Sequence, residues 1–584
     1  MPKHRPGRTK KVADMQPSQE DFLLTGNENL PTVSGNMHLL CICICVIFAV
    51  WVWQLNPFEW LKDDQLNIVT LELAQEYQEN FARDPVFGGN AGDFYPYLYR
   101  VSIKKFTDWF GLIGGHRFAQ FPLMVGYLVV MYFVLYALTR SAPAALLVTL
   151  FSIFWRLSFG GSYWGMDRVH TVQPRSIVLI FTPLLLLMSW KYRRSWWLLV
   201  IFGIMGLLIN ISPPGALFFA IAVWFAMLSQ GRLTRERTLL LGGAVVALII
   251  GAAPFIYCHI AARTEATAAL STQERQLFME ALQFRFSRMS SFPIPLRTVC
   301  TVLSDFSLPL LLGVAGWAVR GQKRGPFDRW LLTYFLVAAI LFVVLQYVMQ
   351  KASFAMGKAP PIVSIMRGQK NAYLILYVYG AVFLRFLFSH IGKRERRILI
   401  VAMTILVFVM PLITFVHKVG NAVRQWENNS AQFRQLMGGR KIEVVGQYGA
   451  IVPVAQWVRK NTPTDSLILF GHKDMPIFRI YALRSIVSSH GCGGLAFYNG
   501  PEKLIQWYNA QKVLEHLNTK SDVERLVKLA EETGSNYIIL PRNIVSVPGW
   551  SPMAYDRYWI VYVPSSASPG KPVYIRSDEF SFPG

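Results

Sequence analysis

Long apolar runs alternate with short polar segments through most of the chain, from about residue 38 to about residue 417. About eleven of these runs approach the ~20 mostly apolar residues that a helix needs to cross a bilayer. After Val416 the chain has ordinary soluble composition through Gly584. The pattern predicts a polytopic α-helical membrane protein with a C-terminal soluble domain and spans at roughly 38–54, 121–139, 142–158, 177–190, 196–211, 214–230, 238–258, 298–319, 329–350, 371–388 and 397–417.

Basic residues set the expected orientation. Residues 1–37 are polar and basic, and the first apolar run begins too late for a cleavable signal. We therefore expect a disordered cytoplasmic tail and a signal-anchor helix. The connections that this orientation places in the cytoplasm are all basic, as cytoplasmic loops usually are: Arg140; Lys191, Arg193 and Arg194; Arg232, Arg235 and Arg237; Arg320, Lys323, Arg324 and Arg329; and Lys393, Arg394, Arg396 and Arg397.

Three long segments fall on the opposite side, namely residues 55–120, 259–297 and 418–584. An odd number of spans places the last of them, the C-terminal domain, outside the cytoplasm. The chain thus divides into a tail (1–37), a membrane domain (38–417) with a large first outside loop (55–120), and an extracytoplasmic domain (418–584). We expect the working surface to be extracytoplasmic.

Composition narrows the classes of partner. The chain is 53% hydrophobic and 16% charged, against about 25% charged for a typical soluble protein. Its net charge is +24, but the basic residues sit in short connections, which fits loops at an anionic leaflet and not nucleic-acid binding. The six cysteines form no disulfide framework, although Cys258 and Cys300, near the ends of successive spans, leave one outside pairing open.

Acidic residues of the first outside loop are candidates for chemistry. Asp63 and Asp64 follow the first span closely, and Asp93 precedes an aromatic run. A carboxylate there can serve as a general base for a hydroxyl or hold a divalent cation. Asp64 can equally be the N-cap of the helix that follows. We expect that helix, reaching Arg83, and another over residues 101–110 to lie along the membrane.

Cations gather at the outer ends of several spans. Asp167, Arg168, His170 and Arg175 form a dense ionisable group before the fourth span. Residues 351–370 contain Lys351, Lys358, Arg367 and Lys370, against the positive-inside rule. We interpret this loop as a miscounted span or a functional basic site. Arginine suits a lipid phosphate, while headgroup anchoring and helix capping are the simpler alternatives. The mixed charges of residues 259–297 predict a solvated, mobile cover.

Residues 449–584 alternate helical and strand patterns, which predicts a small α/β domain with a largely parallel sheet. Expected strands lie at 466–470, 484–488, 537–540, 559–563 and 573–575, with the last two paired. Expected helices lie at 452–459, 475–483, 503–517 and 521–533. The domain contains no G-x-G-x-x-G, P-loop, nucleophile elbow or zinc-ligand pattern, which disfavours nucleotide binding and those catalytic classes.

The stretch Gln456 to Asp465, followed by Ser466 to Phe470, is similar to the start of the soluble domain in large bacterial membrane glycosyltransferases, and Arg479 to Arg484 resembles a later segment. Together with the layout of spans and loops, the chain resembles the GT-C superfamily. The resemblance implies a GT-C-like fold, a polyprenyl-phosphate-linked sugar donor, and an inverting transfer at the outer face of a bacterial inner membrane. The neighbouring Asp63 and Asp64 depart from the Asp-x-Asp form of some members.

On this interpretation Asp63 or Asp64, or Asp93, is the catalytic carboxylate. Arg175, Arg367 and Lys370, with Asp167, Arg168 and His170, bind substrate and neutralise the leaving phosphate. The acceptor is an envelope glycan, lipid or protein, and Mg²⁺ or Mn²⁺ is the candidate cofactor. Two other functions stay open, a non-catalytic envelope scaffold and a transporter or flippase for a lipid-linked substrate.

Overall fold

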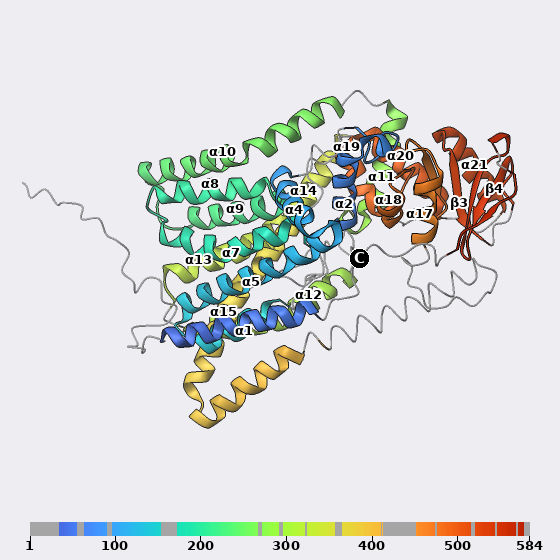
Figure 1. Cartoon of the computed structure of the whole chain (residues 1–584). Coiled ribbons are helices and arrows are strands. Elements are labelled where there is room, and N and C mark those ends of the chain that lie inside the picture. The colour runs from blue at the N-terminus through green and yellow to red at the C-terminus, as the bar shows by residue number, and fades with distance from the viewer. Residues whose placement is uncertain are drawn as a thin grey trace, which may run out of the picture.

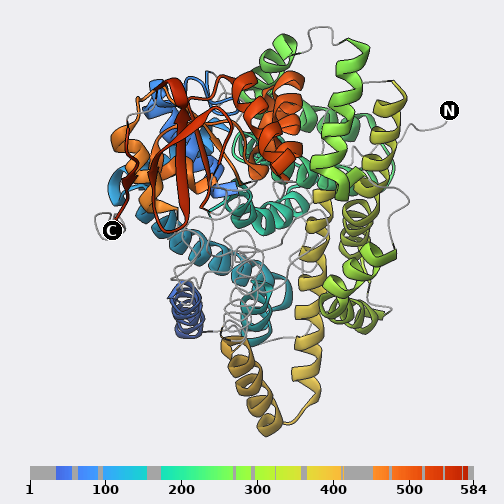
Figure 2. The same cartoon turned by 90° about the vertical axis from the view of Figure 1, so that its right-hand side faces the viewer.

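The structure is a computed structural model of the chain. It describes residues 34–54, 64–89, 96–153, 172–266, 271–290, 296–321, 324–356, 365–409, 412, 451–472, 476–515, 520–542, 546–567 and 570–576. Figure 1 shows two parts, a bundle of long helices and a mixed helix and sheet domain at one end of it. Figure 2 looks onto the end that carries this domain.

The bundle is built from apolar helices that run side by side (Figure 1). Their bounds are α1 (Gly35–Gln54), α5 (Leu112–Thr139), α6 (Ala142–Ser152), α7 (Pro174–Lys191), α8 (Trp197–Ile209), α9 (Pro213–Leu228), α10 (Arg235–Ala266), α12 (Leu296–Arg320), α13 (Pro326–Leu336), α14 (Phe342–Ala355) and α15 (Ala372–His390). A π-helix, η4 (Val337–Leu341), joins α13 to α14, and residues 393–409 form a further helix.

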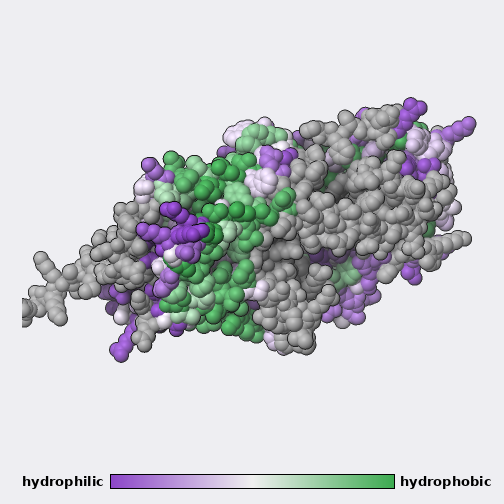
Figure 3. All heavy atoms as spheres, turned by 90° about the horizontal axis from the view of Figure 1, so that it is seen from below, coloured by the Kyte–Doolittle hydropathy of each residue, from purple (hydrophilic) through white to green (hydrophobic). Residues whose placement is uncertain are grey.

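Within the described residues, six helical segments are long and apolar enough to cross a membrane: Gly35–Gln54, Gly114–Thr139, Pro174–Lys191, Arg235–Cys258, Pro326–Met349 and Arg367–His390. Four further apolar helices are shorter. Figure 3 shows a hydrophobic band on the face of the bundle turned to the viewer, with hydrophilic residues towards both ends. The membrane character expected from the sequence is thus supported, and the count of eleven spans stays a prediction.

Small residues let α8 and α10 approach closely. A Cβ atom on Gly206 would collide with Leu248 O, and one on Gly251 would collide with Gly203 O. Asn210 ties the same helices together, because its amide donates to Gly251 O at 2.8 Å and accepts from the Phe255 N–H at 2.9 Å. Close backbone approach is a main source of helix association in membranes, where the hydrophobic effect contributes little.

A buried ion pair joins α12, α13 and α15 at the opposite end of the bundle from the C-terminal domain. Asp328 accepts from Arg320 Nη2 at 2.8 Å and from the Tyr379 hydroxyl at 2.9 Å. It also accepts from Arg320 Nε at 3.3 Å and from the Gly325 N–H at 2.8 Å, which caps α13. Every oxygen of this carboxylate is therefore paired, and the arrangement is structural.

The C-terminal domain has a six-stranded mixed sheet in the order β2-β1-β3-β5-β4-β6. The strands are β1 (Leu467–Phe470), β2 (Ser485–Ile486), β3 (Tyr537–Pro541), β4 (Trp550–Tyr555), β5 (Trp559–Pro564) and β6 (Val573–Tyr574). The helices are α17 (Val452–Asn461), α18 (Pro476–Ala482), α19 (Gly493–Asn499), α20 (Pro501–Glu515) and α21 (Lys520–Thr533), with a 3₁₀ turn η6 (His490–Cys492). Gly534 ends α21 with a φ of 64°, a conformation that glycine adopts freely.

Of two expectations for this sheet, one holds in part and one was wrong. The sheet is mixed, with three of its five pairings parallel and with β5 antiparallel to both β3 and β4. The last two expected strands do not pair, because β4 lies between β5 and β6. The sequence hides β4, since Pro552 interrupts its strand pattern and the pairing with β5 shifts register between Pro552 and Ala554.

The first outside loop and α11 (Thr272–Ser290) pack into the core of the C-terminal domain. Leu66 and Val69 of α2 (Asp64–Glu76) belong to the same buried cluster as Phe278 of α11 and Trp507 of α20. Helix α2 is mostly buried, against the expectation of a helix lying along the membrane. The second half of α11 packs into the core while residues 271–276 are exposed, and the expected role of α11 as a mobile cover stays a prediction. Cys258 carries an exposed free thiol and is not paired with Cys300.

A glycine substitution tests the close α8–α10 packing. We expect Gly251→Ala to destabilise the bundle by about 1–3 kcal/mol, because the added methyl meets the backbone of α8. The matched control is Gly242→Ala on the same helix, where a Cβ atom meets nothing within 4 Å. Thermal unfolding of the detergent-solubilised protein measures both. Equal melting temperatures for the two variants would contradict the packing described here.

Candidate functional site

Three cations from two separate segments gather at the end of the bundle that carries the C-terminal domain. Arg175 lies in the first turn of α7, and Arg367 and Lys370 lie on the 3₁₀ helix η5 (Ile365–Asn371) that leads into α15. Lys370 is only 3% exposed, and the charges of Arg175 and Arg367 act on it. The expected grouping of these three residues is therefore present in the structure.

The start of α9 forms one wall beside Lys370. A Cβ atom on Gly215 would lie 3.7 Å from Lys370 Nζ and 3.0 Å from Ser212 Oγ. The ammonium group of Lys370 therefore lies close to the first turn of α9, while the tight contact at Gly215 is with Ser212. Because a buried ammonium is costly without an anion, a site built this way favours a negatively charged ligand.

Side chains around η5 leave further hydrogen-bonding atoms inside the protein. Gln346 Oε1 accepts from the Ile365 N–H at 2.7 Å, and Gln369 Nε2 donates to Ala339 O in the π-helix η4 at 3.0 Å. Among the described residues, no hydrogen-bond partner exists for Arg367 Nε, Gln369 Oε1 or Asn371 Nδ2, which are all buried. A bound ligand or water is one explanation for such atoms, and π-helical turns are frequent at functional sites.

The other predicted site residues are not placed by the structure. Asp167, Arg168 and His170 lie outside the described residues, as do Asp63 and Asp93. Asp64 begins α2, but its side chain is not among those described. The catalytic roles expected for the three aspartates therefore stay predictions.

A buried acid and histidine form a second group that the sequence did not indicate. Glu72 of α2 faces His116 near the start of α5, with 3.8 Å between Glu72 Oε1 and His116 Nε2. Burial raises the pKa of Glu72 to about 8, against the opposing attraction of Lys104 on α4 (Tyr97–Phe110). The only available signal was that Glu72 stands one helical turn after the apolar Ile68.

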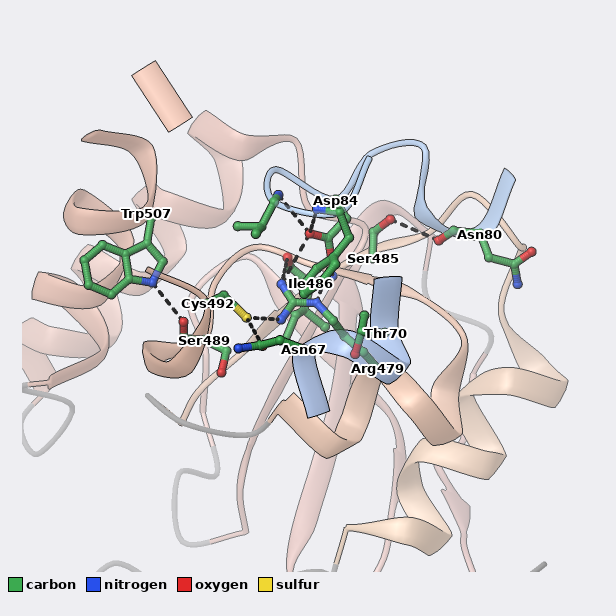
Figure 4. Close-up of polar contacts among 12 residues, drawn as sticks. Asn67, Thr70, Asn80, Asp84, Arg479, Ser485, Ile486, Ser489, Cys492 and Trp507 are labelled. Atoms are coloured by element: carbon green, nitrogen blue, oxygen red, sulfur yellow. Dashed lines mark hydrogen bonds and ion pairs between the residues drawn. The ribbon is translucent and has the colours of Figure 1, made fainter. Parts of the chain in front are cut away.

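A third group joins the first outside loop to the C-terminal domain (Figure 4). Arg479 of α18 and Asp84 are both fully buried, and Arg479 Nε lies 2.8 Å from Asp84 Oδ2. Asp84 also accepts from the Ile486 N–H at 3.1 Å and from the Val86 and Phe87 N–H groups at 3.0 Å. The pair therefore has the hydrogen bonds that a buried ion pair needs.

The remaining donors of Arg479 reach the same junction. Arg479 Nη2 donates to Ile486 O at 3.2 Å, and Nη1 lies 3.1 Å from Cys492 Sγ. The Cys492 thiol donates to Asn67 Oδ1 at 3.3 Å, and Asn67 Nδ2 donates to Gly491 O at 3.3 Å. The segment from Arg479 to Arg484, which carried part of the resemblance, thus holds structural residues.

Further contacts run along the same boundary. Asn80 donates to Leu483 O at 2.8 Å, and Ser485 donates to Asn80 O at 3.0 Å. Arg83 Nη1 donates to Asn536 Oδ1 at 2.6 Å, and Asn499 donates to Val86 O at 2.6 Å. The region from Asn67 to Val86 is therefore an integral part of the C-terminal domain.

Metal ligands are not grouped in the part of the chain that the structure describes, where three or more His, Cys, Asp or Glu side chains nowhere converge. The residues expected to hold Mg²⁺ or Mn²⁺ were the first-loop aspartates, whose side chains are not described.

Comparison with protein-family models finds no match for this chain, and comparison with curated proteins finds no match either.

The buried pair of Asp84 and Arg479 predicts that a substitution of similar size at Asp84 strongly lowers stability. Asp84→Asn removes the charge that pairs with buried Arg479, and we expect it to destabilise the C-terminal domain by about 3–5 kcal/mol. The control is Asp108→Asn, which breaks the exposed pair between Asp108 and Lys104 and should cost under about 1 kcal/mol. Thermal unfolding in detergent compares them, and a similar small effect for both would overturn the assignment.

Proposed function

We propose that the protein is a membrane glycosyltransferase that takes a sugar from a polyprenyl-phosphate-linked donor. The transfer takes place on the extracytoplasmic face, to an envelope glycan, lipid or protein. The observation that supports this best is the convergence of Arg175, Arg367 and buried Lys370 at the end of the bundle that carries the C-terminal domain.

The charge balance of the cationic group favours a phosphate ligand. Both charges that act on Lys370 are positive, so an anion bound there would gain attraction from three cations. When a glycosyl bond breaks, negative charge develops on the phosphate that leaves. Positioned cations that stabilise such a charge are among the largest contributions to catalysis, and arginine forks match phosphate oxygens.

An acceptor hydroxyl needs a base, and the first outside loop is the proposed source. Asp63 and Asp64 stand at the start of α2, and Asp93 is the other candidate in this loop. One of these carboxylates would remove the hydroxyl proton as the oxygen attacks the sugar carbon, and the sugar–phosphate bond would break on the opposite side, with inversion.

Contacts through α2 support placing the two groups in one site. Ile68 of α2 and Val172 belong to one buried cluster, which Ile177 of α7 also contacts. Arg175 lies between Val172 and Ile177 in the sequence. The start of α2 and the first turn of α7 are therefore parts of the same packed region.

The proposed base is tested by exchanging both neighbouring aspartates. We expect Asp63→Asn/Asp64→Asn to lose sugar transfer by at least about a hundredfold, with expression unchanged. Membranes containing wild-type or variant protein are given radiolabelled polyprenyl-phosphate sugars. Retained activity in the double variant would overturn this assignment of the base. Wild-type protein inactive on a broad donor panel would favour the scaffold or the transporter.

The proposed phosphate site has its own test. We expect Lys370→Gln to lower kcat/KM for the donor by about a hundredfold or more, because one buried cation beside the leaving phosphate is removed. Lys351→Gln is the matched control, since Lys351 is an exposed cation of the same connecting region. Equal activity of the two variants would show that Lys370 does not act on the donor.

A further inference from the structure

Helix α2 is buried on two opposite sides. On one side Leu66, Asn67 and Val69 pack into the C-terminal domain. On the other side Ile68 and Glu72, one helical turn apart, contact the bundle through α4 and α5. Because Asn67 and Asp84 bind the C-terminal domain so closely, α2 moves with that domain. The side with Ile68 and Glu72 is then the surface through which the domain rests on the bundle, and we call this contact of α2 with α4 and α5 the seat.

The seat has an apolar half and a polar half. Ile68 is 1% exposed and packs with Tyr99, Ile103, Ala119 and Val172. In the polar half, Glu72 Oε1 lies 3.8 Å from His116 Nε2, beyond hydrogen-bonding distance. Within the described structure, neither Glu72 Oε1 nor either ring nitrogen of His116 has a hydrogen-bond partner, although all three atoms are buried.

The charged groups that face Glu72 come from three helices. Lys104, Arg100 and Asp108 lie on α4, Glu76 lies on α2 itself, and His116 lies on α5. Burial dominates over these charges and raises the pKa of Glu72 from 4.5 to about 8. The seated helix therefore favours the neutral acid.

The direction of the pH dependence follows from this shift. Once α2 leaves the seat, Glu72 is exposed and ionises near its ordinary pKa of 4.5. Between this value and about 8 Glu72 is protonated more fully in the seated state than in the detached state, so the contribution of Glu72 to seating weakens as pH rises. Below pH 4.5 the contribution is complete, and above about 8 Glu72 is charged in both states and the loss stops growing.

We propose that Glu72 and His116 form a proton-operated joint, which seats the C-terminal domain on the helical bundle when Glu72 is protonated and loosens that contact when Glu72 ionises. The ligand of this site is the proton itself. The joint does not depend on the proposed glycosyltransferase activity, because it rests only on the α2, α4 and α5 contacts. It would make access to the end of the bundle respond to external pH.

A thiol placed in the seat reports on its opening. Ile68→Cys puts a cysteine at a buried position, and its reaction with a maleimide is followed by mass spectrometry of the peptide. Each rate is divided by the rate of the same protein denatured in detergent at the same pH, which removes the titration of the thiol. We expect the corrected rate to rise roughly ten- to hundredfold from pH 6 to pH 9.

Three further variants isolate Glu72. Ile68→Cys with Glu72→Gln, or with Glu72→Met, should give a flat profile, because neither side chain ionises. Ile68→Cys with Glu76→Gln loses the same charge at an exposed position one turn along and should behave like Ile68→Cys alone. Native Cys492, buried beneath α2 on the other side, should stay protected throughout.

Other outcomes would overturn the proposal. A flat profile for Ile68→Cys alone would show that the seat does not respond to protons. An equal rise in the Glu72→Gln and Glu72→Met backgrounds would show that another group is responsible. If the corrected rate at Cys492 rose in the same way, the C-terminal domain itself would be unfolding, and the pH response would not belong to the contact between α2 and the bundle.

Discussion

The buried pair of Asp84 and Arg479 is the constraint on which the arrangement of this protein depends. Two ions removed from water lose several kcal/mol of hydration each, and only close pairing with further hydrogen bonds recovers it. Here both side chains are fully buried and 2.8 Å apart, although 395 positions separate them in the chain. Neither charge tolerates burial alone, so the first outside loop and the C-terminal domain must fold together.

This coupling has consequences across the protein. Because Asp84 fixes the loop that follows α2, and Asn67 binds beside Cys492, α2 belongs to the C-terminal domain. Its other side meets α4 and α5 through Ile68 and Glu72. Helix α2 thus carries packing contacts between the domain and the bundle next to Arg175. Its first residue is the candidate Asp64, which follows Asp63 in the sequence. Any movement of the domain would also move that end of the chain.

The sequence predicted local structure well and long-range pairing poorly. The apolar runs were visible because each helix carries its own signal. The Arg175, Arg367 and Lys370 group was visible because, in the expected topology, these basic residues run against the positive-inside rule. The sequence did not single out four buried residues, because each acts with a partner that only the fold brings close: Glu72 with His116, and Asp84 with Arg479. The irregular apolar pattern of α2 now has a physical reason, because a helix buried on two sides shows no single stripe. Strand β4 was missed because Pro552 obscures its pattern.

At this end of the protein, three buried ionisable groups are stabilised in three different ways, and the differences indicate the role of each group. Asp84 and Arg479 neutralise one another, which gives a permanent connection. Glu72 has no hydrogen-bonded counter-ion at its buried oxygen and is neutral through protonation instead, which makes its contact dependent on pH. Lys370 is buried beside two more cations, so neither a paired acid nor its own neighbours offset its charge. A bound anion would stabilise its charged form, and this argues that the cationic group, unlike the other two groups, is a site for an anionic ligand.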